Sequence, residues 1–541
     1  MRQFKHIIKS YIRPSKWAML MLSAALMVSC SDDPTGDDNT GTEDRPLNEI
    51  ATWMDSRLKK EYYWMDEYIE KHAQFDLTLE WDKFLNNTLK KLSTNHDDGR
   101  VYADGTRYFY SYIYRQESVT ASSSSRSSLP TENGYGFELA PYAVIMSNLE
   151  GYNDNDRVCF IEHTYPGSAA AEAGLLRGDI ILQVNGKKMS AQTFSNIWEE
   201  LQYGTSGSVK ITARSYNKEL EKYEAKEYEL TTSAFERNPV AFSDILQLPE
   251  EFDDEGKKIG YMSYLSFDKN YDEALVDAMA DLSQKGVTDM ILDLRANSGG
   301  DVTSSILLAS MLMDESYVGP GKVYTRLVHN PSNKIYKDTE HTLQLKYTPE
   351  GASEAVDLPN IGIKKLWVIC SENTASASEM VIVGLRGLDV EVTLIGTTTE
   401  GKNCGMEVSY KTHDGYKYEF APITFMSENG KGFNDYGDGI VPDIDLIAMA
   451  EKPSLDKDLI SLCHNYPLPY TTWGNIDNDI ALAEVVMQIY GKTLFTPSTK
   501  AVMPHQATTR AEGSVTFELT SLKMEKKGLS ARGLIVYPDE E

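Results

Sequence analysis

Two short polar turns and one lysine stand out as residues whose types and spacing could do chemistry. The first turn, residues 294–300, reads Leu-Arg-Ala-Asn-Ser-Gly-Gly, and the second, residues 374–379, reads Thr-Ala-Ser-Ala-Ser-Glu. Lys402 follows farther along the chain. A serine hydroxyl becomes a nucleophile when a neighbour accepts its proton, and a lysine can do so if burial keeps it neutral. A serine of the second turn and Lys402 are therefore candidates for a catalytic Ser-Lys pair, which is an attested variant of the catalytic triad.

The elements around these turns must bring them together. Residues 257–425 alternate between strand-like and helix-like patterns. Strands are expected at 259–267, 289–294, 366–370 and 390–395, and helices at 271–284, from about 301, and at 376–388. This alternation predicts an α/β domain with helices on a mainly parallel sheet. Each turn follows a buried strand, which is where such folds place their ligands.

The start of the helix at Ser376 suggests how an oxyanion would be held. The backbone N–H of Ala377 would lie where the helix dipole favours negative charge. Gly299 or Gly300 of the first turn would bring a second N–H within reach, and the sequence does not distinguish between them. Glu379, one turn along the helix, either orients the pair or is an acid favoured by the dipole.

Other interpretations of these residues remain open. Ser376 could be an ordinary helix N-cap, and Ser378 could be the nucleophile in its place. Arg295 is expected to hold its turn rather than to touch a substrate. Histidine catalysis is disfavoured, because His329 and His413 fall in polar loop or hairpin positions without a nucleophile motif beside them.

A second group of motifs precedes the α/β pattern. Residues 166–186 read PGSAAAEAGLLRGDIILQVNG, a short helix and a strand that runs into an Asn-Gly turn. This stretch resembles a PDZ domain. Upstream, Tyr135, Gly136 and Phe137 resemble the PDZ carboxylate-binding loop, in which successive N–H groups face one anion. The adjoining strand edge would pair with an extended peptide end.

The three motifs, in this order and downstream of a PDZ-like segment, resemble the carboxy-terminal processing (tail-specific) serine protease family. The resemblance covers residues 134–445 and includes Gly-Asp-Gly-Ile-Val-Pro-Asp at 437–443. It implies a crotonase/ClpP-like peptidase core with Ser376 as nucleophile, Lys402 as base and no cofactor. Many members have a glutamine shortly after the lysine. Here the residue that orients the lysine is missing or displaced to Glu407.

The N-terminal residues resemble an export signal. A basic stretch is followed by a short apolar run at 17–29, too short to span a bilayer and typical of a secretory signal. Small residues before Cys30 resemble the lipobox of bacterial lipoproteins, which implies lipidation of Cys30. The acidic stretch that follows is expected to be a solvated tether, and it resembles the surface-export signals of Bacteroidetes lipoproteins.

Length and composition set the outer bounds. A chain of 541 residues is expected to form several domains, and its net charge of −28 disfavours nucleic acid as a partner. Five cysteines without CxxC or HExxH spacing give no support for a disulfide scaffold or a metal site. The expected organisation is a signal peptide (1–29), a tether (30–45), an N-terminal helical domain with a Ser-rich linker (46–130), a PDZ domain (131–235), a peptidase core (236–450), and a C-terminal helix and tail (451–541). The expected fold is multidomain α/β, with the PDZ β-domain inserted into the core or preceding it.

These observations predict a serine endopeptidase of the cell envelope. It would be lipid-anchored to the outer membrane, on the periplasmic or the surface face. Its PDZ domain would capture the free, flexible carboxyl terminus of a protein or peptide. The alternative is a catalytically silent, peptide-binding scaffold lipoprotein. A nucleotide site at the GxxxxGK stretch 396–402 is disfavoured, because Asn403 stands where Mg²⁺ binding needs Ser or Thr.

Overall fold

The structure of the protein is a computed structural model. It describes residues 46–101, 107–117, 131–145, 151–217, 222–252, 256–349, 351–452, 455, 457–469, 472–477, 479–495, 518–523 and 534–536. The predicted signal, Cys30 and the tether lie outside these residues, as does most of the Ser-rich linker. The chain separates into two units, Met1–Pro46 and Leu47–Glu541, and the following description concerns the second.

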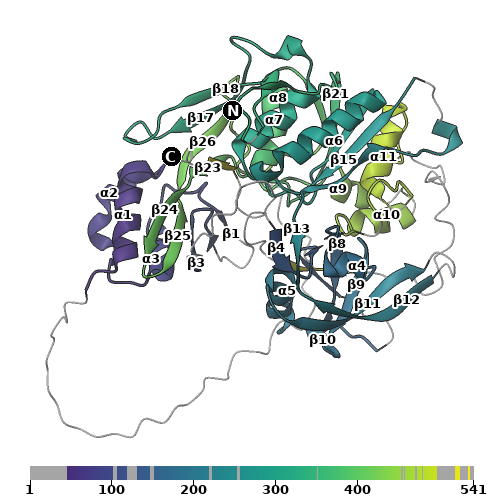
Figure 1. The fold of residues 1–541 in the computed structure, drawn as a ribbon, viewed down its shortest axis with the longest axis horizontal. Coiled ribbons are helices and arrows are strands. Elements are labelled where there is room, and N and C mark those ends of the chain that lie inside the picture. Colours follow the sequence, from purple (N-terminus) through teal and green to yellow (C-terminus); the bar gives the residue numbers. More distant parts are fainter. Residues whose placement is uncertain are drawn as a thin grey trace, which may run out of the picture. The chain divides into compact units, whose positions relative to one another are not determined.

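A six-stranded sheet forms the centre of the α/β core (Figure 1). Its strands, in spatial order, are β14 (Val240–Ile245), β15 (Ile259–Tyr264), β16 (Asp289–Asp293), β21 (Lys365–Cys370), β22 (Glu391–Gly396) and β27 (Ile444–Asp445). Neighbours pair in parallel from β15 to β27, and β14 is antiparallel to β15. The prediction of a mainly parallel α/β core is therefore confirmed.

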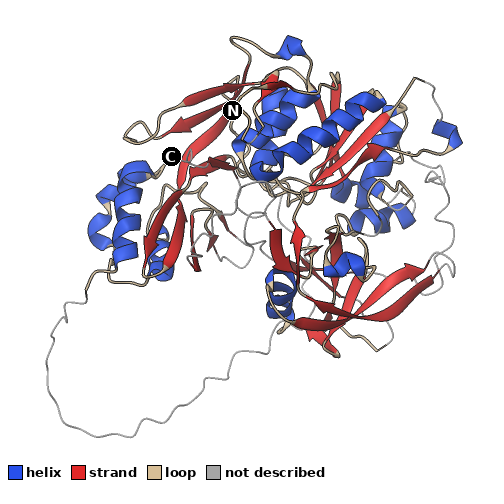
Figure 2. Cartoon of the chain, viewed as in Figure 1, coloured by secondary structure: helices blue, strands red, loops and turns tan. Residues whose placement is uncertain are grey.

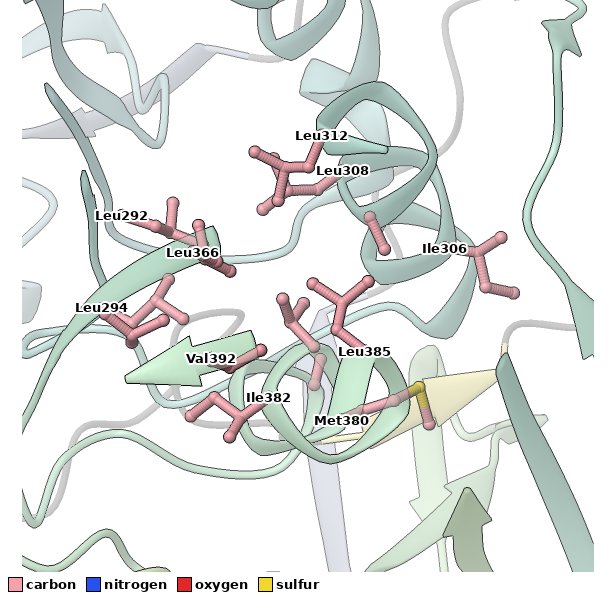
Figure 3. Packing of buried hydrophobic residues seen from close by; sticks show 14 of the residues in the cluster. Leu292, Leu294, Ile306, Leu308, Leu312, Leu366, Met380, Ile382, Leu385 and Val392 are labelled. Atoms are coloured by element: carbon pink, nitrogen blue, oxygen red, sulfur yellow. The ribbon is translucent and has the colours of Figure 1, made fainter. Parts of the chain in front are cut away.

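Helices cover both faces of this sheet. One face carries α6 (Asp272–Lys285), α7 (Val302–Leu312) and α8 (Ala377–Gly387), and the other carries α9 (Leu446–Ala450), α10 (Lys457–His464) and α11 (Ile480–Ile489). Successive strand residues point to opposite faces, so Leu292 packs with the first set and Ile291 with the second. Figure 3 shows part of the first of these cores, to which Leu308 of α7 and Leu385 of α8 both contribute buried side chains.

The position of α7 fixes the end of the first turn. Every residue of α7 other than Thr303 is buried, and a helix that is apolar all round belongs in a core. Its N-cap is Asp301, whose carboxylate accepts a hydrogen bond from the N–H of Thr303 at 2.7 Å. The helix therefore begins two residues after Gly300.

A second sheet lies beside the core and carries the residues that follow Lys402. Its strands, in spatial order, are β18 (Thr339–Thr342), β17 (Val323–His329), β26 (Ile423–Asn429), β23 (Cys404–Glu407) and β29 (Leu534–Val536). β23 pairs antiparallel with β26 on one side and parallel with β29 on the other.

The N-terminal helices share their core with a distant part of the chain. α1 (Glu49–Glu61), α2 (Met65–Glu70) and α3 (Trp81–Leu89) lie beside the hairpin of β24 (Ser409–His413) and β25 (Tyr416–Ala421), as Figures 1 and 2 show. β3 (Tyr112–Glu117) pairs with β25, after the short strands β1 (Arg100–Val101) and β2 (Arg107–Tyr108). The region expected to be a helical domain therefore has no separate core, because the helices bury their apolar stripes against residues 404–426.

Residues 131–236 form a β-domain with a core of its own. Its elements are β4 (Thr131–Gly134), β5 (Phe137–Leu139), β6 (Tyr142–Ile145), β7 (Asp156–Arg157), β8 (Cys159–Thr164), α4 (Ala169–Glu172), β9 (Ile180–Val184), β10 (Lys187–Ser190), α5 (Phe194–Tyr203), β11 (Ser208–Asn217), β12 (Lys222–Thr231) and β13 (Ser233–Glu236). Asn185 and Gly186 connect β9 to β10 with φ values of 50° and 72°, as the predicted tight turn requires. Because the preceding residues pack on 404–426, this domain is an insertion.

One strand from the C-terminal tail pairs with this inserted domain. β28 (Glu518–Lys523) runs antiparallel to β6. In the described part of the chain, none of the helices combines the length and the apolar character needed to cross a bilayer.

Gly384 provides a test of the packing between α8 and the second sheet. A Cβ at this position would lie 2.4 Å from the ring of Tyr324, which is buried and joined to Ser305 by a hydrogen bond of 2.8 Å. Because the ring has no room to move, Gly384→Ala is expected to lower the free energy of unfolding by about 1–3 kcal/mol in urea denaturation. Gly437→Ala is the control, since its nearest neighbour would be 3.5 Å away. Equal stability of the two variants would contradict this packing.

Candidate active site

The two polar turns lie against each other at the ends of β16 and β21. The carbonyl of Asn297 accepts hydrogen bonds from the N–H of Ala375 at 3.2 Å and from Ser378 Oγ at 3.0 Å. Ser371 Oγ donates to the carbonyl of Arg295 at 2.6 Å. The parallel pairing of β16 and β21 brings their ends to the same edge of the sheet. The structure thus brings together the two turns that the sequence singled out.

Ser376 occupies a strained position between β21 and α8. Its φ of 60° and ψ of −111° fall in a region that L-residues rarely adopt. Ser376 is also the N-cap of α8 and forms a capping box with Glu379. Its side chain is fully buried, and its Oγ makes no hydrogen bond of ordinary geometry with the described residues. A strained strand-to-helix turn is the setting in which α/β hydrolases place a nucleophilic serine. Ser378 differs, because its Oγ is held by Asn297.

The carboxylate of Glu379 joins the serine turn to the lysine turn. Its Oε2 accepts hydrogen bonds from the N–H of Ser376 at 2.7 Å and of Lys402 at 2.8 Å. Its Oε1 accepts from the N–H of Gly401 and from Thr399 Oγ1, both at 2.6 Å. Complete burial raises the pKa of the Glu379 carboxyl to about 7, although these four donors oppose the shift. Glu379 is thus an acid in the first turn of α8 that also joins the backbone at Ser376 to the backbone at Gly401 and Lys402.

Lys402 is buried with only 5% of its surface exposed. Burial lowers the pKa of its ammonium below the ordinary value, which favours the neutral amine that a general base requires. Its Nζ lies 4.6 Å from the centre of the Tyr110 ring. The hydroxyl of Tyr110 donates to Glu400 Oε1 at 3.1 Å. No local motif indicated Tyr110, because a contact between distant segments brings it to the lysine.

The residue suggested as a displaced partner of the lysine has another role. Glu407 Oε1 lies 2.8 Å from His329 Nε2, and its other oxygen accepts a hydrogen bond from Thr424 Oγ1. His329 is the last residue of β17, at the start of the connection to its antiparallel neighbour β18, so it takes the hairpin position of the two that were expected, and its side chain is buried. A buried carboxylate needs hydrogen-bond donors, and those of Glu407 lie on neighbouring strands, where the local sequence does not indicate them.

The glycine turn touches the serine directly. A Cβ on Gly299 would lie 2.8 Å from Ser376 Cβ and 3.0 Å from Ala377 N, and its φ is 105°. Only glycine fits this approach. The N–H of Gly299 donates to Asn297 Oδ1 at 2.8 Å. Ala377 is the first residue of α8, where N–H groups have no acceptor within the helix.

The predicted carboxylate-binding loop connects β4 to β5. The carbonyl of Tyr135 accepts from the N–H of Ala170 at 3.0 Å, and the carbonyl of Gly136 accepts from Ser168 Oγ at 3.0 Å. Gly136 has a φ of 80°, while Tyr135 and Phe137 have buried side chains. The loop is thus fixed against α4 and the residues before it.

Side chains of α5 occupy the edge of β5 that would meet a peptide. The N–H of Leu139 donates to Gln202 Oε1 at 2.8 Å, and Trp198 Nε1 donates to the carbonyl of Ala140 at 3.1 Å. A peptide strand that pairs with β5 would have to displace the Gln202 amide from Leu139.

The structure also decides against a phosphate-binding loop at 396–402. The N–H groups of Gly401 and Lys402, which would face a phosphate, are bound to Glu379, and a strand follows instead of a helix. Within the described residues, no cluster of three or more His, Cys, Asp or Glu side chains is arranged to hold a metal ion.

The α/β core, the strained serine at its strand–helix turn and the inserted β-domain define a PDZ-containing peptidase fold. Residues 258–446 match the family model described as Peptidase family S41, and residues 160–214 match that of a PDZ domain. The chain therefore carries an S41 peptidase domain and a PDZ domain, and the resemblance inferred from the motifs is confirmed. Superposition on the crystal structure of a Bacteroides fragilis protein assigned to the S41 proteases gives a TM-score of 0.56 at 23% identity, covering 81% of this chain and 97% of that one.

Curated relatives are more distant in sequence. The chain is 25% identical over 305 residues to a chloroplastic C-terminal processing peptidase of Tetradesmus obliquus, covering 55% of this chain and 58% of the relative. It is 22% identical over 290 residues to a probable CtpA-like serine protease of Staphylococcus aureus, covering 54% of this chain and 50% of the relative. The chain thus spans about half the length of the curated relatives it matches.

The raised pKa of Glu379 predicts a pH-dependent contribution to stability. The folded state holds the proton up to about pH 7, whereas the unfolded state releases it near its ordinary value of 4.5. Stability from this group is thus fully present below pH 4.5 and is lost as the pH rises through 7, by up to about 3 kcal/mol. Glu379→Gln removes the titration, so the stability advantage of wild type over this variant should shrink between pH 5 and pH 8.

Urea denaturation at a series of pH values measures this effect. Glu315→Gln, which changes an exposed carboxylate, is the matched control and should leave the pH dependence unchanged. A difference between wild type and Glu379→Gln that stays constant over the whole pH range would show that Glu379 does not titrate there.

Proposed function

We propose that the protein is a serine-type endopeptidase in which Ser376 is the nucleophile and Lys402 the general base. The observation that carries the proposal is the unpartnered, buried Oγ of Ser376 on a strained turn, tied through Glu379 to the backbone of Lys402. The S41 domain and the curated relatives named as serine or C-terminal processing peptidases support the same activity.

The proposed reaction is acyl transfer. Ser376 Oγ attacks the scissile carbonyl carbon while Lys402 Nζ accepts its proton, and the carbonyl becomes an oxyanion. When the C–N bond breaks, the Lys402 ammonium gives that proton to the leaving amine, and an ester on Ser376 remains. Water then attacks the ester with Lys402 again as base, which releases the acid and restores the serine.

Two backbone N–H groups are proposed to hold the oxyanion. Ala377 supplies one from the start of α8. Because the N–H of Gly299 is already bound to Asn297, Gly300 is the better candidate for the second. The role of Glu379 is to fix the two backbones so that neither reacting side chain drifts from the other.

The proposed substrate is a protein or peptide with a free, flexible carboxyl terminus. The PDZ domain and the relatives' names support this class. The loop at Tyr135, Gly136 and Phe137 would bind the carboxylate, with Gln202 moving off β5 as the peptide pairs. The proposed location is the cell envelope, with lipidated Cys30 as the anchor in the outer membrane.

Labelling with a fluorophosphonate probe tests the nucleophile. Wild type should be labelled, and Ser376→Ala should not, because the probe reacts with the activated oxygen. Lys402→Met should slow labelling by at least about 100-fold, since the loss of a general base typically costs that much. In-gel fluorescence against time gives the rates.

Ser378→Ala is the control, because Ser378 lies on the same helix but its Oγ is already held by Asn297. It should be labelled like wild type. If Ser376→Ala kept its labelling and Ser378→Ala lost it, the nucleophile would be Ser378. Absence of labelling in wild type, with peptide binding retained, would support the silent scaffold instead.

A peptide and its amidated twin test the capture of carboxyl termini. The free peptide should be cleaved with a lower KM, by about tenfold, because the amide lacks the anion that the glycine loop binds. Steady-state kinetics on both peptides, at equal length and sequence, give this ratio. Equal KM values would contradict capture of the terminus while leaving the peptidase activity intact.

A further inference from the structure

The residues proposed to react are closed off from solvent. Ser376 has 0% of its surface exposed and Lys402 has 5%. A polypeptide substrate must reach Ser376 Oγ, and therefore some part of the molecule has to move before it can do so. The segments next to the elements that carry Ser376 and Lys402 are the candidates for this movement.

β29 lies next to elements that adjoin both parts of the site. It pairs in parallel with β23, with Leu534 opposite Gly405 and Val536 opposite Glu407. β23 begins two residues after Lys402. β29 also has Cα atoms within 8 Å of α7, the helix that follows Gly300. The strand is thus next to β23, which follows the lysine, and near α7, which follows the glycine turn.

The same tail makes a second strand contact, on the PDZ domain. β28 pairs antiparallel with β6, with Lys523 opposite Tyr142 and Glu518 opposite Ile145. The hydroxyl of Tyr142 in turn donates to Glu372 Oε1 at 2.6 Å and accepts from the side-chain amide of Asn373 at 2.8 Å. These two residues belong to the turn that leads from β21 to Ser376.

We propose that β28 and β29 form an internal pseudosubstrate, and that β23 is the edge on which an extended substrate segment pairs beside the reacting residues. Backbone hydrogen bonds at a strand edge accept many sequences, so an unfolded peptide can replace β29. The tail competes from within the chain, where its effective concentration is in the millimolar range. This proposal rests on the proposed peptidase function and adds the subsite and its resident occupant.

Removal of the tail tests the competition. A variant that lacks the residues after 513 should cleave an unstructured peptide with a KM lower by about tenfold than the full chain. A synthetic peptide of residues 530–541 should inhibit this variant competitively, and a scrambled peptide of the same composition should not. Unchanged KM after removal of the tail would overturn the proposal.

Single substitutions separate the two contacts. Ile535→Pro removes an N–H from β29 and should lower KM, and Leu519→Pro does the same for β28. Ser530→Pro, between the two strands in sequence, is the matched control and should behave like the unaltered chain. Equal kinetics for Ile535→Pro and Ser530→Pro would contradict a competing role for β29.

A measurement independent of activity keeps this proposal distinct from the proposed function. Hydrogen–deuterium exchange at residues 404–407 should be faster by at least about tenfold in the variant without the tail, and the 530–541 peptide should restore protection. Unchanged exchange would overturn the pairing even if the enzyme were active. If exchange is faster but no serine probe labels the protein, β29 remains the occupant of this edge and only the peptidase function is refuted.

Discussion

The arrangement of this site depends on one buried carboxylate. Glu379 accepts hydrogen bonds from the backbone of Ser376, Gly401 and Lys402 and from the hydroxyl of Thr399. Two segments far apart in the sequence are thus held by the same side chain. A shift of either turn would leave buried donors unpaired. The free-energy cost of an unpaired buried donor exceeds the net stabilisation that one typical hydrogen bond provides. The serine and lysine backbones are therefore fixed relative to each other before any substrate arrives.

The surrounding fold supports this carboxylate from several sides. The N–H of Ile440 donates to Thr399 Oγ1 at 2.8 Å, so the segment at 437–443 holds the hydroxyl that Glu379 binds. Below the turns, the buried guanidinium of Arg295 pairs with Asp293 and Asp479, both at 2.7 Å. Asp479 is also the N-cap of α11. The C-terminal helix is thereby tied to the glycine turn, and the layers of the core and the geometry of the site depend on each other.

The parts that the sequence predicted are those with a local signal. The buried strands, the glycine turn, the helix at Ser376 and the PDZ hairpin each follow from spacing or turn residues that act within a few positions. The contributions that it missed come from long-range contacts. Tyr110 reaches Lys402 only because residues 47–117 fold onto 404–426. Glu407 likewise pairs with His329 across the intervening strand β26, and neither residue carries a local mark of that contact.

Two kinds of interaction meet at the site, and they differ in how easily they exchange. The hydrogen bonds to Glu379 are all accepted by one fully buried carboxylate, so water and peptides have no route to compete for them. The pairing of β29 with β23 uses backbone groups at the edge of a sheet, which any extended segment can supply equally well. The proposed function and the proposed exchange at β23 fit this division, in which a rigid centre lies beside an edge that accepts different segments. The reacting groups need fixed positions, whereas the edge that is proposed to hold the substrate backbone needs only hydrogen bonds that do not depend on the side chains.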